Sequence, residues 1–166
     1  KSIRDFRTTS LPSFREVLTN YNKFCKQTVV MLILVTGGFG SVGLSIINEL
    51  LLRGHSVRVL ELETKKTKKY AKQYATQIEV FWGNLLDSAC LQKTIENIDV
   101  VVHLAGILPP LTETNRELGF KVNVEGSHNI IQAIKSSASK PPIIFASSAS
   151  VLGPTQNRTP PISAYD

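Results

Sequence analysis

The sequence is poor in the residues on which several classes of protein depend. It has two cysteines, Cys25 and Cys90, which form neither a C-x-x-C pair nor a metal-ligand spacing. We therefore predict no metal site, and the pattern favours a reduced, cytoplasmic setting. No apolar run reaches the ~18 residues that a transmembrane helix requires, so no membrane-spanning segment is predicted.

Acidic residues are outnumbered, with 13 Asp and Glu against 19 Lys and Arg and a net charge of +6. Most of this excess lies in residues 1–30, which contain six basic and two acidic residues. The remainder of the chain is nearly neutral. A nucleic-acid-binding surface is therefore not expected, and the partner we predict is a small-molecule substrate.

Methionine occurs once, as Met31, directly before the first predicted strand. We interpret residues 1–30 as a basic N-terminal appendage and residues 31–166 as the folded domain. An organelle-targeting segment is the alternative for residues 1–30, but Asp5 and Glu16 count against it.

Apolar and β-branched runs alternate with helical patterns through the rest of the chain, and 42% of the 166 residues are hydrophobic. This alternation predicts an α/β fold: a Rossmann-like, doubly wound parallel sheet with helices on both faces. The predicted strands are residues 32–35, 56–60, 78–82, 99–104 and 142–147, and the predicted helices are 41–53, 65–77, 88–95 and 114–137.

Spaced glycines join the first strand to the first helix: Gly37, Gly40 and Gly43 follow Thr36. A strand, a glycine turn and a helix in this order are typical of a dinucleotide phosphate site. The first glycine suits the tight turn, the second admits a pyrophosphate, and the third lets the helix pack on the strand. The start of the helix near Ser41 adds free N–H donors.

Further polar residues follow the next strands, at the sheet edge where such folds bind ligands. Glu61 ends the second strand, where a carboxylate accepts the adenosine ribose hydroxyls and repels a 2′-phosphate. This favours NAD over NADP. The alternative is that four lysines bind the 2′-phosphate of NADP as a phosphate clamp: Lys65, Lys66, Lys68 and Lys69. A run of lysines is, however, usually a solvated helix face.

Three other strand ends have two possible interpretations each. Asn84 could bond adenine, with Leu85 packing on the ring, or could simply close a turn. His103 within the fourth strand is interpreted as a satisfied structural residue, not as a metal ligand or general base. Hydroxyls around Ser147 and Ser148 follow the fifth strand, where a serine could bond a substrate oxygen.

Taken together, the motifs resemble those of the extended short-chain dehydrogenase/reductases, the NAD-dependent epimerase/dehydratase family. The resemblance covers Met31 to the end, through five ordered segments: residues 36–43, 83–87, 103–106, 122–126 and 147–153. It implies a cofactor site with the following members: Gly37, Phe39, Gly40, Ser41 and Val42 at the pyrophosphate, with Gly43 beneath; Glu61 at the ribose; Asn84 and Leu85 at adenine; Leu104, Ala105 and Gly106 along the cofactor; Asn123 supporting the active site; and Ser148 as the catalytic serine.

The sequence departs from the family pattern at three places. Asn84 replaces the usual aspartate, and Leu152 stands where a tyrosine is common. The catalytic Tyr-x-x-x-Lys is not found, because Tyr165 is the only tyrosine after Ser148. We interpret Tyr165 as a residue of the proline-rich loop, the alternative being that it is the catalytic tyrosine.

The resemblance implies an NAD-dependent epimerase, dehydratase or oxidoreductase, with a nucleotide sugar as the leading substrate class and a homodimer as the expected assembly. Residues 31–166 would be its incomplete cofactor-binding part, with the substrate domain beyond, and alone would be inactive. The alternative is a non-catalytic dinucleotide-binding module, either a truncated product or a redox-sensing regulator.

Overall fold

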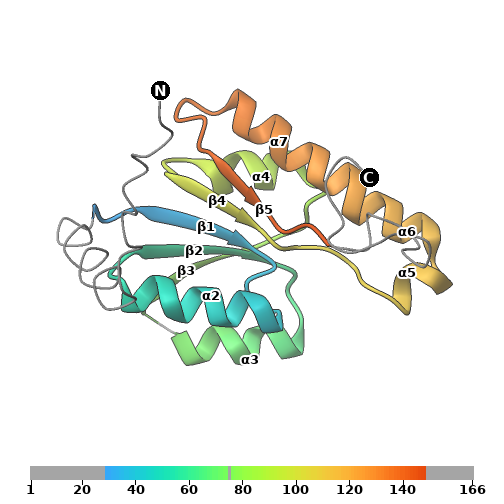
Figure 1. Ribbon diagram of the computed structural model, residues 1–166, viewed down its shortest axis with the longest axis horizontal. Helices are drawn as coiled ribbons and strands as arrows, with labels where there is room; N and C mark the ends of the chain where they lie inside the picture. Colours follow the sequence, from blue (N-terminus) through green and yellow to red (C-terminus); the bar gives the residue numbers. More distant parts are fainter. Residues whose placement is uncertain (1–28, 75, 149–166) are drawn as a thin grey trace, which may run out of the picture. The chain divides into compact units, whose positions relative to one another are not determined.

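The computed structural model describes residues 29–74 and 76–148, which form strands and helices in alternation (Figure 1). Predictions about residues 1–28 and 149–166, including Leu152 and Tyr165, lie outside this part. The elements are β1 Leu32–Thr36, α2 Ser41–Leu52, β2 Ser56–Glu61, α3 Lys65–Tyr74, β3 Ile78–Trp82, α4 Ser88–Ile95, β4 Val100–His103, α5 Leu111–Thr114, α6 Arg116–Phe120, the π-helical turn η1 Lys121–Glu125, α7 Gly126–Ser136 and β5 Ile143–Phe145.

The five strands form one parallel sheet in the order β3-β2-β1-β4-β5. The chain starts in the middle, winds outward to β3, and then returns to β4 on the other side of β1. This reversal makes the carboxyl ends of β1 and β4 neighbours, with Thr36 opposite His103. The switch point of such a sheet is where ligands bind. The predicted Rossmann-like fold is confirmed.

Helices cover both faces of the sheet, α2 and α3 on one side and α4 and α7 on the other (Figure 1). Alternate residues of β1 enter the two cores: Leu34 lies in the core beneath α4 and α7, and Val35 in the core beneath α2. Burial on both faces explains why the strands read as continuous apolar runs. Within the described residues, no helix is long and apolar enough to cross a membrane.

The single helix predicted over 114–137 is wrong, because the segment is divided and begins earlier. Asn115 interrupts it with a φ of −137°, and its side chain accepts a hydrogen bond from Leu118 N that caps α6. One π-helical turn then follows, in which the N–H of Gly126 reaches back to the carbonyl of Lys121. Such turns are frequent at functional sites.

Asp87 starts α4 by accepting hydrogen bonds from Ala89 N at 3.0 Å and Cys90 N at 3.1 Å. We expect Asp87→Ala to lower the free energy of unfolding by about 1 kcal/mol, because two N–H groups lose their acceptor. Urea unfolding measures this. Asp87→Asn is the control and should stay within a few tenths of 1 kcal/mol of wild type, since asparagine caps equally well. Equal losses in both variants would contradict the capping role.

Candidate functional site

The turn between β1 and α2 is fixed by close backbone packing. Gly37 has a φ of +68°, and a Cβ added there would lie 2.8 Å from the Cα of Ala105. Its N–H donates to the carbonyl of Leu60 at 3.0 Å. A Cβ on Gly43 would lie 2.5 Å from the carbonyl oxygen of Gly38. Both glycines are therefore needed by the fold itself, which brings α2 against the turn.

Gly40 is different, because it is exposed and its surroundings are less crowded. An added Cβ would approach only the carbonyl oxygen of Gly37, at 3.3 Å, and its φ of −72° suits any residue. Gly40 is the N-cap of α2 and offers no side-chain acceptor to the first turn. Ser41 and Val42, which begin the helix, are exposed. An uncapped helix start beside an exposed glycine can bind an anion. We call this position, Gly40 to Val42, the cradle.

Glu61 lies beside this cradle, as the last residue of β2. Its carboxylate accepts hydrogen bonds from Phe39 N and from Leu62 N, both at 3.1 Å. The side chain of Phe39 is 4% exposed and contacts the rings of Tyr70 and Trp82. Glu61 therefore places a negative charge next to the glycine turn and orders it at the same time.

The segment after β3 is a tight turn. The Asn84 side chain accepts a hydrogen bond from Leu86 N at 3.0 Å, so its turn-closing role is present. Leu85 is 6% exposed and belongs to the core beneath α4 and α7. Its side chain is therefore committed to the core and does not pack on an adenine ring, and its carbonyl accepts a hydrogen bond from Asn129 Nδ2 at 3.1 Å.

The loop after β4 is held from two sides. Thr36 Oγ1 accepts hydrogen bonds from Leu104 N at 3.3 Å and Ala105 N at 3.2 Å. From η1, the Asn123 side chain accepts from Ile107 N at 2.7 Å and donates to Ile107 O at 2.9 Å. Gly106 admits this approach, since a Cβ there would lie 3.2 Å from Asn123 Oδ1. Asn123 supports the loop, which carries three of the predicted cofactor-lining residues.

His103 ends β4 beneath this loop and is buried, with both ring nitrogens hydrogen-bonded. Its partners are Thr36 Oγ1 at 2.7 Å and Ser127 Oγ at 3.1 Å. Its interpretation as a satisfied structural residue is confirmed. Burial lowers the pKa of His103 from the ordinary 6.5. The role of Ser127 was missed, since its contact with His103 spans 24 positions in sequence and follows only from the tertiary fold.

The remaining predicted residues are placed as follows. Ser148 lies three residues after the end of β5 and is exposed, and its catalytic role stays a prediction. The four lysines of the alternative phosphate clamp are exposed on α3, and Lys68 pairs with Glu63 at 2.5 Å. These positions match a solvated helix face.

Elsewhere, a hollow of about 790 Å³ lies between the C-terminal ends of α4 and α7. It is lined by residues such as Gln92 and Ser136 and contains none of the predicted site residues. Over 29–74 and 76–148, no group of three His, Cys, Asp or Glu is placed to hold a metal ion. The glycine turn and its neighbouring strand ends are therefore the candidate site.

Comparison with known proteins shows the family of the chain. The model of the 3-beta hydroxysteroid dehydrogenase/isomerase family matches residues 34–164. UDP-N-acetyl-alpha-D-glucosaminuronate decarboxylase from Bacillus cytotoxicus is 34% identical over 134 residues, covering 80% of this chain and 40% of the decarboxylase. A 3 beta-hydroxysteroid dehydrogenase/Delta 5-->4-isomerase from Mycobacterium tuberculosis is 32% identical over 130 residues, 75% of this chain and 34% of the enzyme.

Solved structures show the same fold. A short-chain dehydrogenase/reductase superfamily protein from Agrobacterium tumefaciens, with bound NAD, superposes with a TM-score of 0.62 at 30% identity. The match covers 79% of this chain and 37% of that one. The chain thus spans well under half the length of these relatives. It belongs to the 3-beta hydroxysteroid dehydrogenase/isomerase family, within the extended short-chain dehydrogenase/reductases.

Proposed function

We propose that this chain is the NAD-binding part of an NAD-dependent oxidoreductase, epimerase or decarboxylase. The observation that carries the proposal is the open position at Gly40, on an uncapped helix start, with the carboxylate of Glu61 beside it. The helix start suits the pyrophosphate, and the carboxylate suits a ribose with free hydroxyls. The Agrobacterium relative was solved with NAD, which supports the same choice.

When bound, NAD would supply the hydride acceptor for oxidation at a hydroxyl-bearing carbon. The residues of this chain would hold and orient it: the glycine turn at the pyrophosphate, Glu61 at the ribose, and the loop 104–107 along its length. Ser148 would hydrogen-bond the substrate oxygen that is oxidised. The proton from that oxygen needs a base, for which the family uses a tyrosine assisted by a lysine.

The substrate we propose is a nucleotide sugar, which the Bacillus cytotoxicus relative supports by acting on a UDP-linked sugar acid. The matching family model makes a 3β-hydroxysteroid the second candidate. Incubating the full-length protein with NAD and each substrate class, with products followed by mass spectrometry, distinguishes them. Conversion of the steroid alone would overturn the sugar assignment, and conversion of neither class would contradict both.

Preference for NAD over NADP is expected to depend on Glu61. We expect Glu61→Gln to reduce the ratio of NAD to NADP affinity by about 10-fold, since the charge that repels a 2′-phosphate is lost while one acceptor oxygen stays. Calorimetric titration of the full-length protein with both cofactors measures this.

Glu63→Gln is the matched control, because it removes a carboxylate two residues away that pairs with Lys68 instead of the turn. Its cofactor preference should equal that of wild type. A wild-type preference for NADP would refute the role of Glu61 and restore the α3 lysines as the phosphate clamp.

A further inference from the structure

His103 connects two parts of the molecule through its two ring nitrogens. On one side Nδ1 lies 2.7 Å from the hydroxyl of Thr36, the last residue before the glycine turn. On the other side Nε2 lies 3.1 Å from the hydroxyl of Ser127, in the first turn of α7. The ring itself is 2% exposed, so water does not replace either partner.

The partners fix where the ring proton resides. The Ser127 hydroxyl donates its one hydrogen to the carbonyl of Asn123 at 2.7 Å, so toward His103 it acts as acceptor and Nε2 must carry a hydrogen. Thr36 Oγ1 already accepts from the N–H groups of Leu104 and Ala105, so its own hydrogen goes to Nδ1. Every donor then has one acceptor only if the ring is neutral, with its proton on Nε2.

We propose that His103 is a positioning residue for the cofactor site: in this one tautomer it fixes the loop 104–107 against both the glycine turn and the π-helical turn. This rests on the proposed NAD binding at that loop. Thr36 holds the beginning of the loop through two N–H groups, and Asn123 holds Ile107 at its end. The hydrogen bonds from Thr36 through His103 and Ser127 to Asn123 form one continuous chain.

Protonation would break this chain at Thr36. A hydrogen on Nδ1 would face an oxygen whose two acceptor positions are taken by Leu104 and Ala105, so at least one of those N–H bonds would be lost. Burial holds the pKa of His103 below 6.5, which favours the neutral ring in the folded protein. The ordered loop is therefore fully stabilised above about pH 6.5, and this stabilisation is lost as the pH falls through the lowered pKa.

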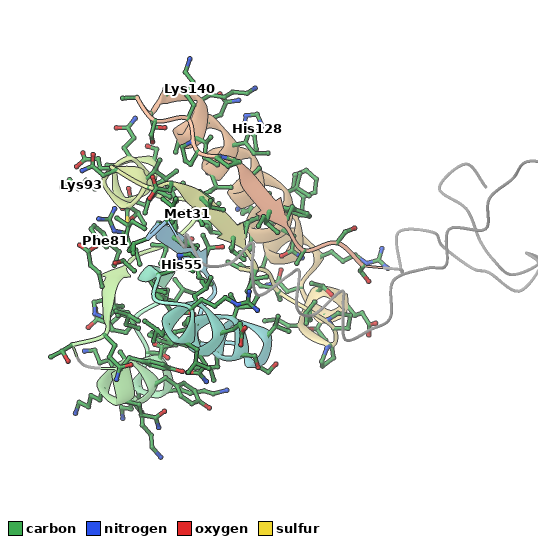
Figure 2. The ribbon with its side chains drawn as sticks, turned by 60° about the vertical axis from the view of Figure 1, so that its left-hand side comes forward. Met31, His55, Phe81, Lys93, His128 and Lys140 are labelled. Atoms are coloured by element: carbon green, nitrogen blue, oxygen red, sulfur yellow. The ribbon has the colours of Figure 1, made fainter. Side chains whose placement is uncertain are left out.

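Among the described residues, the elements packed against His103 present no other buried titratable group. β1 and β5 contain no titratable residue, and β5 contributes the ring of Phe145, 5.4 Å from His103 between centroids. The titratable residues of η1 and α7 are exposed, and His128 projects from the outer side of α7 (Figure 2). These residues are Lys121, Glu125, His128 and Lys135.

The test measures NAD affinity of the full-length protein as a function of pH, together with the tautomer of His103 by nitrogen NMR of the imidazole ring. We expect a neutral Nε2–H ring at about pH 7.5, and an affinity that stays constant down to about pH 6.5 and falls only as the ring takes up its second proton in the same NMR titration. His103→Asn keeps an acceptor near Nδ1 but cannot titrate, so its affinity should be weakened at about pH 7.5 and independent of pH over this range. His128→Gln is the matched control and should keep the wild-type profile.

A ring that carries its proton on Nδ1, or is charged at neutral pH, would overturn the inference without the need for any variant. A wild-type pH profile in His103→Asn would overturn it as well. Absence of NAD binding at every pH, with the Nε2–H tautomer intact, would instead overturn the proposed function and the positioning role that rests on it.

Discussion

Replacing Gly40 by valine should lower the NAD affinity of the full-length protein at least ~100-fold, about 2.7 kcal/mol of binding free energy. The free energy of unfolding should change by no more than about 1 kcal/mol, the range of substitutions at a helix N-cap. The backbone of Gly40 is extended, with φ −72° and ψ 167°, so valine needs no strained conformation. One contact, with the carbonyl of Gly37 at 3.3 Å, needs a small adjustment.

The large effect on binding and the small effect on folding have one cause. Apart from the carbonyl oxygen of Gly37, no atom lies within 4 Å of the place that the valine Cβ would take, which is beside the helix start that a pyrophosphate would use. A branched side chain there keeps the phosphates from the helix start, and with them the attraction of the helix dipole. Nothing in the core has to move.

Calorimetry gives the affinity, and urea unfolding gives the stability. Ser45→Val is the matched control, because Ser45 is exposed one turn further along α2 and the same side chain there leaves the cradle open. It should bind NAD within about 2-fold of wild type. Equal affinity for Gly40→Val and wild type would show that the pyrophosphate does not bind at this turn.

The fold could be predicted because its signals are local. Each strand reads as a short apolar run, and each polar residue that follows a strand must come to the same edge of a parallel sheet. This is why Glu61 and the glycine turn could be placed together before the structure was known. In the structure, the carboxylate of Glu61 accepts the N–H of Phe39 across 22 positions in sequence.

Features that depend on distant partners could not be predicted in the same way. Thr36 and His103 are 67 positions apart, and the hydrogen bond between them follows only from the pairing of β1 with β4. The division of 111–136 was missed because apolar spacing continues through it. Asn115 acts there as a local cap, and the Asn123 side chain, within the π-helical turn that follows, bonds to Ile107.

Gly37→Ala tests the other property of the turn, its dependence on backbone packing. We expect it to lower the free energy of unfolding by about 3 kcal/mol, in the range of strain at a special φ,ψ position combined with overpacking. Alanine at this position would have to adopt a φ of +68°. Its Cβ would lie 2.8 Å from the Cα and 2.9 Å from the N of Ala105. Both are backbone atoms of a residue held by Thr36, so they cannot turn aside as a flexible side chain could.

Gly54→Ala separates the two contributions. Gly54 has a φ of +79°, similar to Gly37, but a Cβ there would meet nothing within 4 Å. It therefore measures the conformational cost alone, about 1 kcal/mol. The difference between the two variants, about 2 kcal/mol by urea unfolding, would be the energy of the contact between the glycine turn and the loop after β4. Equal losses would mean that this contact yields easily, and that hydrogen bonds, those of the Thr36 hydroxyl among them, hold the two halves of the site together instead of close packing.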